Sequence, residues 1–193
     1  MNTYPIVGMT GFKGSGKDTV AKHLVKMYGF ERYAFADKMK EAIAALLGIP
    51  LEKVDEWKEP TLDGLPRAEV IVSVMNNTEY AFEWREFLQR FGTEMGRGVF
   101  GQDFWVNLLI SRPWYTPVVV SDVRLRNEAI ALKELGAAIV RIERPGYESD
   151  GHESEQMLPA DYVLNNDSDR MQLYVRIDHM MQELYNMQIV KEQ

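Results

Sequence analysis

The stretch "GMTGFKGSGKDTVAKHL", from Gly8 to Leu24, constrains the fold of this chain more than any other feature. Three glycines, Gly11, Gly14 and Gly16, lie between an apolar run typical of a buried strand and a segment with helical spacing that ends at Gly29. Glycine lets the backbone curl so that successive N–H groups face inward, and the start of a helix adds partial positive charge. The stretch therefore predicts a phosphate-binding loop in an α/β fold.

The residue after the loop lysine departs from the usual pattern. Lys17 is placed to reach terminal phosphates, but Asp18 follows it where a serine or threonine is common. Asp18 could hold Mg²⁺ directly or through water, Thr19 could supply a hydroxyl instead, or Asp18 could simply favour the positive helix end. We expect the nucleotide to be held along the whole loop, which comprises Gly11, Phe12, Lys13, Gly14, Ser15, Gly16, Lys17, Asp18 and Thr19.

Beyond the loop, strand-like and helix-like segments alternate. Apolar runs predict strands at residues 32–36, 117–122, 137–144 and 160–167, and helical spacing recurs at 37–48, 81–96, 102–112, 124–136 and 169–187. We expect Asp37 to cap the first of these helices and Gly48 to end it. The alternation predicts a parallel sheet flanked by helices, whose ligands bind beyond the carboxyl ends of the strands. Polar residues that fall there are Asp37, Asp122, Arg144 and Asn165.

The chain length fits one domain, residues 1–193, with two special segments. The pattern weakens over about 49–80, which predicts a partly irregular insertion, and about 144–160 is polar and rich in glycine and proline, as expected of a segment that closes over substrates.

Composition narrows the function classes. With no cysteine there is no disulfide or thiolate metal site, and three scattered histidines make no convincing metal site either. No apolar run approaches the roughly eighteen residues of a membrane span, and the start of the sequence does not resemble a signal peptide, so we expect a cytoplasmic protein. The net charge of −7 argues against nucleic-acid binding, while arginines in the middle and later parts of the chain suit a small anionic ligand.

Several motifs occur together in a specific order. They are "GFKGSGKDT", "REFLQRFGTEMGR", "DFWVNLL", "VVVSDVRLRNEAIALKELGAAIVRIERPG" and "HESEQMLPADYVLNND". This order resembles the deoxynucleoside monophosphate kinases best known from bacteriophages, and the loop of that family naturally contains GKDT. The resemblance covers most of the chain, least securely residues 49–80. It implies a three-layer nucleoside monophosphate kinase fold, with ATP and Mg²⁺ on the donor side and a deoxynucleoside monophosphate as acceptor.

The resemblance also implies roles for individual residues. The acceptor side is expected to use Asp37, Lys40, Arg67, Arg85, Gly92, Thr93, Trp105, Asp122, Arg124, Asn127 and Glu128. On the donor side, the loop is joined by Arg144, His152 and Asn165. Because arginine grips phosphate with paired hydrogen bonds, we expect catalysis to depend on Lys17, Arg85, Arg124, Arg144 and Asp122. Candidate Mg²⁺ ligands are Asp18, Thr19 and Asp122.

Alternatives stay open at this stage. Arg85 could pair on a solvated helix, Asp122 could only cap the helix that follows it, and Trp105 could be a core residue. The methionine-rich last helix suits the core or a subunit contact, so a homodimer is plausible. Rival functions are a kinase of another small acceptor, such as dephospho-coenzyme A or phosphomevalonate, and an ATP-binding switch protein.

Overall fold

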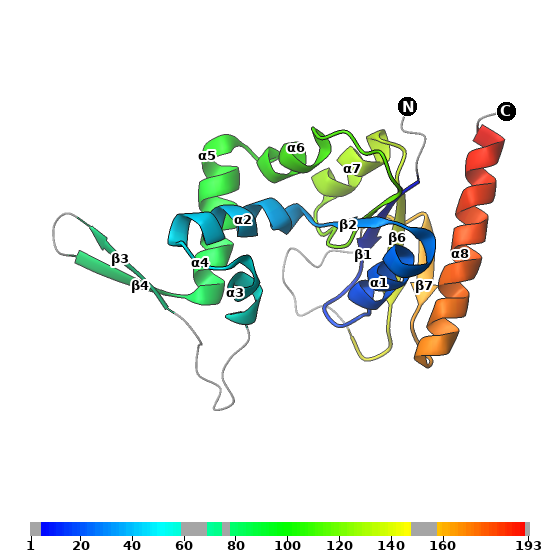
Figure 1. Cartoon of the computed structure of the whole chain (residues 1–193), viewed down its shortest axis with the longest axis horizontal. Coiled ribbons are helices and arrows are strands. Elements are labelled where there is room, and N and C mark those ends of the chain that lie inside the picture. Colours follow the sequence, from blue (N-terminus) through cyan, green and yellow to red (C-terminus); the bar gives the residue numbers. More distant parts are fainter. Residues whose placement is uncertain (1–4, 59–68, 75–77, 148–157, 192–193) are drawn as a thin grey trace. The chain divides into compact units, whose positions relative to one another are not determined.

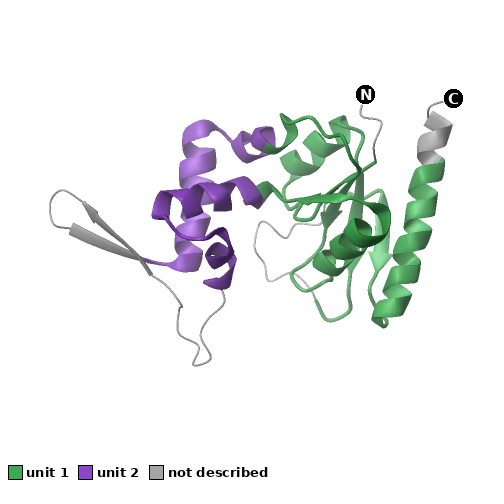
Figure 2. Ribbon diagram, viewed as in Figure 1, with its two compact units in different colours: residues 1–35, 109–193 green, residues 36–108 purple. Residues whose placement is uncertain are grey.

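The computed structural model describes residues 5–58, 69–74, 78–147 and 158–191 (Figure 1). The chain divides into two compact units, one made of Met1–Phe35 with Leu109–Gln193 and the other of Ala36–Leu108 (Figure 2). Among the described residues, no helix is both long and apolar enough to cross a membrane.

The first unit is built on a five-stranded sheet with strand order β2-β5-β1-β6-β7. Every pair of neighbouring strands in it is parallel. Its strands are β1 (Ile6–Thr10), β2 (Glu31–Tyr33), β5 (Val118–Val120), β6 (Ala138–Glu143) and β7 (Tyr162–Asn165), and its helices are α1 (Lys17–Tyr28), α7 (Arg126–Glu134) and α8 (Arg170–Lys191). The α/β class and the flanked parallel sheet expected from the sequence are confirmed.

Helices cover both faces of this sheet because successive strand side chains point to opposite faces. Val7 and Met9 of β1 belong to a buried cluster that also contains residues of α1 and α8. Between them, Gly8 faces the other way, and a Cβ there would lie 3.0 Å from Leu132 of α7. The central strand is buried along its whole length, as a sheet covered on both faces requires.

Helix boundaries in this unit follow local signals with one exception. Gly29 ends α1 with a φ of 69°, as expected. The helix predicted to begin at Asp37 instead begins at Phe35, so the expectation that Asp37 caps it is wrong. Strand β2 accordingly ends at Tyr33 and is shorter than predicted.

The second unit consists mainly of helices with one small sheet. Its elements are α2 (Phe35–Leu47), which starts at the unit boundary, α3 (Leu51–Glu56), β3 (Glu69–Val74), β4 (Thr78–Glu83), α4 (Trp84–Arg90), the π-helix η1 (Phe91–Arg97), α5 (Gly98–Phe100) and α6 (Phe104–Ile110), which runs into the first unit. The predicted insertion at about 49–80 thus contains a helix and an antiparallel hairpin. The helix predicted from residue 81 begins later, at Trp84. The residues before it, "TEYAFE", form strand β4, which pairs with β3.

A separate core holds this second unit together. Ile43 and Val54 are fully buried in it, and two tryptophans, Trp84 and Trp105, are its largest members. Gly48 ends α2 with a φ of 64°, as the sequence predicts.

Candidate nucleotide site

The loop between β1 and α1 has the curled backbone that the sequence predicts. Gly11, Gly14 and Gly16 all adopt positive φ angles, of 139°, 81° and 110°. Residues with a Cβ rarely adopt such φ angles, so the turn requires glycine at these positions. The amide of Ser15 closes the turn by donating to the carbonyl of Phe12 at 3.1 Å.

Neighbouring atoms leave no room for a Cβ on these glycines. At Gly11 a Cβ would lie 2.4 Å from the carbonyl oxygen of Ile142 on β6, and at Gly16 it would lie 2.5 Å from Nδ2 of Asn166 after β7. The loop is therefore packed against the carboxyl ends of β6 and β7, the two strands on one side of β1. This is the edge at which ligands bind in sheets of this kind.

Lys17 and the start of α1 supply positive charge to the loop. The Lys17 ammonium donates to the carbonyls of Gly11 and Phe12 at 2.6 and 2.8 Å, which holds it across the loop. Gly16 precedes α1 without a side-chain cap, and Asp18 in the first helical turn is exposed. A helix start with no capping side chain offers its amides to an anion.

A buried hydroxyl also faces this loop. Ser15 is only 1% exposed, and its Oγ has no hydrogen-bond partner in the structure. A buried polar atom without a partner is costly and rare, and a phosphate oxygen is a partner of the right kind. The loop residues thus fit a bound phosphate chain.

A cavity of about 410 Å³ opens beside the loop, within the first unit. Its size suits a small-molecule ligand. The lining combines loop backbone with three arginines and is made of Thr10, Gly11, Phe12, Val123, Arg124, Arg141, Ile142, Glu143, Arg144, Pro145, Tyr147, Asn165 and Asp167. Three of the predicted site residues, Arg124, Arg144 and Asn165, thus share a cavity with the loop.

Arg144 is joined to the loop by a contact that sequence analysis missed. Its guanidinium donates to the carbonyl of Gly14 at 3.2 Å and lies 4.7 Å from the centre of the Tyr147 ring. That ring in turn packs on Gly14, where a Cβ would lie 2.3 Å from it. The sequence feature that could have identified Tyr147 is its position in "RPGY", a turn directly after a predicted strand.

The residue that binds the loop from β7 is the neighbour of the one predicted. Asn166 donates through Nδ2 to the carbonyl of Ser15 at 2.8 Å, whereas Asn165 lines the cavity and its carbonyl accepts from Arg176 at 2.6 Å. Arg176 also donates to Asp167, and this hydrogen bond holds the pKa of Asp167 below its usual range.

Asp122 and Glu128 organise backbone at the end of β5. Asp122 accepts the amide hydrogen of Phe35 at 2.8 Å, so it caps the start of α2. Glu128 is 3% exposed and accepts from the amides of Arg124 and Leu125, at 2.8 and 3.0 Å, which caps α7. Asn127 is half-buried in the first turn of α7.

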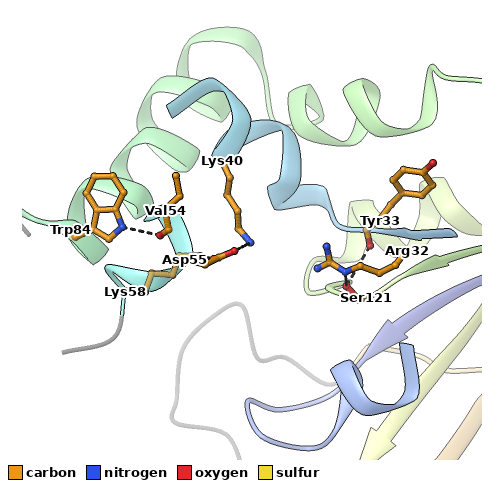
Figure 3. A network of polar contacts seen from close by, with 8 residues as sticks. All are labelled: Arg32, Tyr33, Lys40, Val54, Asp55, Lys58, Trp84 and Ser121. Carbon is orange, nitrogen blue, oxygen red and sulfur yellow. Dashed lines mark hydrogen bonds and ion pairs between the residues drawn. The ribbon is translucent and has the colours of Figure 1, made fainter. Parts of the chain in front are cut away.

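A further arginine near the same strand end was not predicted. Arg32 donates to the Ser121 hydroxyl at 3.0 Å, and the Ser121 amide donates to the carbonyl of Tyr33 at 2.9 Å (Figure 3). The contact tightens the edge strand against β5 directly before Asp122.

In the second unit, two residues predicted for the acceptor side, Lys40 and Arg85, contact α3 or the residues just after it. Lys40 and Lys58 donate to Asp55 at 2.8 and 2.6 Å (Figure 3). Partial burial raises the pKa of Asp55, but these two hydrogen bonds outweigh it and hold that pKa below its usual value. Arg85 is exposed and donates to the Lys58 carbonyl at 2.9 Å.

Of the other residues predicted for the acceptor side in this unit, Asp37 lies in the first turn of α2, and three lie around η1. Thr93 is exposed on it and Gly92 is half-buried. Trp105 is only 7% exposed and donates its indole N–H to the Gly92 carbonyl at 2.8 Å, so the structure places it in the core. Arg67 and His152, also predicted, lie outside the described residues.

Comparison with known proteins gives the family. A sequence model described as "Deoxynucleotide monophosphate kinase" matches residues 53–177, more than half of the chain. A protein of Acanthamoeba polyphaga mimivirus is 32% identical over 185 residues, which covers 89% of this chain and 93% of that one. The chain belongs to the deoxynucleotide monophosphate kinase family.

Two further matches cover most of both chains. The deoxynucleotide monophosphate kinase of Enterobacteria phage T4 is 25% identical to this kinase over 240 residues, covering 93% of this chain and 99% of that one. Among solved structures, a gluconokinase from Sinorhizobium meliloti has a TM-score of 0.46 at 14% identity, covering 97% and 99% of the two chains. Membership of the deoxynucleotide monophosphate kinase family makes this enzyme a phosphotransferase.

Mg²⁺ would have few protein ligands in this kinase. Among the described residues, no three His, Cys, Asp or Glu side chains are grouped so that they could hold a metal ion. Mg²⁺ usually keeps several waters and binds one or two carboxylates together with substrate phosphates. Asp18 and Thr19 at the start of α1, and Asp122 after β5, are the residues that the sequence predicts for that role.

A second polar cluster of the kinase, away from the cavity, was not foreseen. His23 of α1 is buried and contacts Asp178 of α8 at 2.9 Å, and Tyr28 donates to the same carboxylate oxygen at 2.8 Å. The His23 ring also stacks on Tyr174 with centroids 4.3 Å apart. The sequence near His23 gives no sign of this contact, because Asp178 lies 155 positions away.

Proposed function

We propose that this kinase transfers the γ-phosphoryl group of ATP to a deoxynucleoside monophosphate, giving ADP and a deoxynucleoside diphosphate. The observation that carries the proposal is the glycine loop at the start of α1, with Lys17 across it, in a chain of this family. The cavity beside the loop gives the donor nucleotide room next to main-chain amides.

The reaction asks little covalent chemistry of the protein. An oxygen of the acceptor phosphate forms a bond to the γ-phosphorus while the bond from that phosphorus to the β–γ bridging oxygen breaks. The attacking oxygen is already ionised at neutral pH, so no proton has to be removed. Catalysis then depends on position and on cations near the transferred group. Lys17 and Arg144, both bonded to loop carbonyls, supply such cations on the donor side.

Arginines and lysines are proposed to bind the acceptor. Arg124 lines the cavity, and Arg85 is exposed on α4. Arginine binds phosphate through two parallel hydrogen bonds, which orients as well as attracts it. Lys40 and Thr93 are proposed to contact the acceptor from the second unit.

Mg²⁺ is proposed as the required ion, held by the ATP phosphates with Asp18, Thr19 or Asp122. When bound, it neutralises charge on the phosphates. Asp18 is the favoured side chain because it is exposed in the first turn of α1, whereas Asp122 already accepts the Phe35 amide.

The test is a panel of deoxynucleoside and ribonucleoside monophosphates with ATP and Mg²⁺, followed by separation of the nucleotide products. We expect diphosphate formation with one or more deoxynucleoside monophosphates, and ADP release that depends on the acceptor. ADP release that ignores the acceptor would instead show a nucleotide-hydrolysing switch. Dephospho-coenzyme A and phosphomevalonate are included as controls. Transfer to one of these alone would show that the acceptor is not a deoxynucleoside monophosphate.

A homodimer in the cytoplasm stays a prediction. Met180 and Met181 of α8 are buried in the chain's own core, whereas Met171 is 68% exposed. Light scattering tests the assembly, since a dimer would give twice the 22.3 kDa of one chain.

A further inference from the structure

Trp105 and the π-helix η1 are coupled in a way that the family resemblance does not suggest. We infer that Trp105 is a positioning residue for acceptor binding, which acts by fixing the Gly92 carbonyl and not by stacking on a base. The inference rests on the proposed function, because it assumes that Thr93 on η1 contacts the acceptor.

The backbone of η1 is wider than an α-helix. The amide of Gly98 donates to the carbonyl of Thr93, a spacing of five residues. Such turns carry one extra residue, are rare, and occur frequently at functional sites. A π-turn needs support from neighbouring structure, since the same residues would form an α-helix more readily.

The support comes from the Trp105 indole. Its N–H donates to the Gly92 carbonyl at 2.8 Å. A carbonyl has two lone pairs, so it can accept this bond in addition to one within the helix. The bond fixes the peptide between Gly92 and Thr93 on its buried side, while the Thr93 side chain is exposed.

Gly96 makes this contact sterically possible. A Cβ on Gly96 would lie 2.4 Å from Nε1 of Trp105 and 2.5 Å from two further indole atoms. The indole therefore lies directly on the backbone of η1, in the space that any other residue at 96 would fill. The sequence "GTEMG" supplies both the carbonyl that is bound and the gap that admits the ring.

Stacking on a base is incompatible with the surroundings of this ring. Trp105 is 7% exposed, and Phe104 packs edge-on against it at 4.7 Å between ring centres. A stacked base would need an open ring face. The buried N–H bond to Gly92 is the contact that remains available for a role in binding.

A matched pair of substitutions tests the bond. Trp105→Phe keeps an aromatic ring but removes the N–H. Trp84→Phe does the same to a tryptophan of the same core, whose N–H donates to Val54 in α3 at 2.9 Å (Figure 3). We expect Trp105→Phe to lower kcat/KM for the deoxynucleoside monophosphate by about tenfold or more, the effect of one lost hydrogen bond, with the KM for ATP within twofold. Trp84→Phe should change neither by more than about twofold.

A second pair tests the gap. Gly96→Ala pushes on the indole and should reproduce the kinetics of Trp105→Phe. Gly98→Ala is the control, since a Cβ there would meet only the Thr93 carbonyl, at an ordinary 3.6 Å. If Gly96→Ala and Gly98→Ala behave alike, or if Trp105→Phe and Trp84→Phe do, the inference is wrong.

Amide hydrogen exchange separates this inference from the proposed function. Trp105→Phe should speed exchange in Phe91–Gly98 by about tenfold, whereas Trp84→Phe should not. If the wild-type enzyme transfers phosphate to no deoxynucleoside monophosphate, the proposed function fails and the acceptor role fails with it. If transfer is normal but exchange in this segment is equal in the two variants, only the role of Trp105 is overturned.

Discussion

The link between α1 and α8 offers the sharpest test of the energetics, and Asp178→Ala is the perturbation. Asp178 accepts hydrogen bonds from His23 at 2.9 Å and from Tyr28 at 2.8 Å, and both donors belong to the helix that follows the phosphate loop. Removing the carboxylate leaves the His23 ring, which is 9% exposed, without this partner.

The magnitude follows from these contacts. Hydrogen bonds to a charged group contribute roughly 1.5–3 kcal/mol each when shielded. The Asp178 side chain is 46% exposed, so solvent screening reduces the sum of the two, and we expect a loss of about 2 kcal/mol in the free energy of unfolding. For a chain of this length, that loss lowers the thermal midpoint by about 4–8 °C.

Thermal denaturation followed by circular dichroism measures the effect. Glu183→Ala is the control, because Glu183 pairs with His179 on the surface of the same helix at 3.4 Å, and such pairs contribute less than about 1 kcal/mol. Equal midpoints for the two variants would refute the reasoning.

The pH dependence gives a second check. The hydrogen bond from His23 holds the pKa of Asp178 below its usual value. Burial raises that pKa by less than this bond lowers it, and the bond from Tyr28 lowers it further. A lowered pKa stabilises the fold above the ordinary value of 3.8, and that contribution is lost as the pH falls through the folded-state value. The difference in the free energy of unfolding between wild type and Asp178→Ala should therefore become smaller below about pH 4.

Four other changes have defined outcomes. Lys17→Ala should reduce phosphoryl transfer by at least about a hundredfold with an unchanged thermal midpoint, because its ammonium bonds to two loop carbonyls and a loop lysine contributes little to the core. A fully active folded variant would remove the donor-site assignment. Arg144→Ala should lower turnover about tenfold or more in a steady-state assay while costing less than about 1 kcal/mol of stability, since its contacts are exposed; an unchanged rate contradicts this. Burial, and then the bond to Asp178, raise the pKa of Tyr28 to about 12, so the free energy of unfolding should fall as the pH rises from 10 to 12. Denaturant titrations at each pH should show a smaller fall for Tyr28→Phe. Gly14→Ala should raise the KM for ATP, because its Cβ would collide with the Tyr147 ring, whereas Gly29→Ala, with a similar positive φ but open space around it, should cost stability alone.

Much of the candidate site followed from local sequence. The glycine loop, Lys17 and the strands at the sheet centre were predicted because their signals are short in range: spacing, residue type and the order of elements. Of the cavity-lining residues, Arg144 and Asn165 were expected at this edge because the carboxyl ends of parallel strands meet there, whereas Arg124 was expected from the family resemblance.

Other features depended on partners far away in the chain. The start of α2 moved to Phe35 because Asp122, 87 positions later, accepts its amide. Asn166, and not its neighbour Asn165, binds the loop because strand register decides which of two adjacent amides faces it. Neither the start of α2 nor the asparagine that binds the loop can be predicted from the neighbouring residues.

By itself, then, the amino-acid order determined that this chain forms a parallel sheet with a phosphate loop at the end of its first strand, because backbone conformation and hydrophobic spacing are local properties. Only the tertiary structure decided that Trp105 fastens a π-turn, that Tyr147 packs on Gly14, and that His23 meets Asp178. Those contacts depend on which side chains packing brings within a few ångströms of each other, and no spacing along the chain encodes that distance.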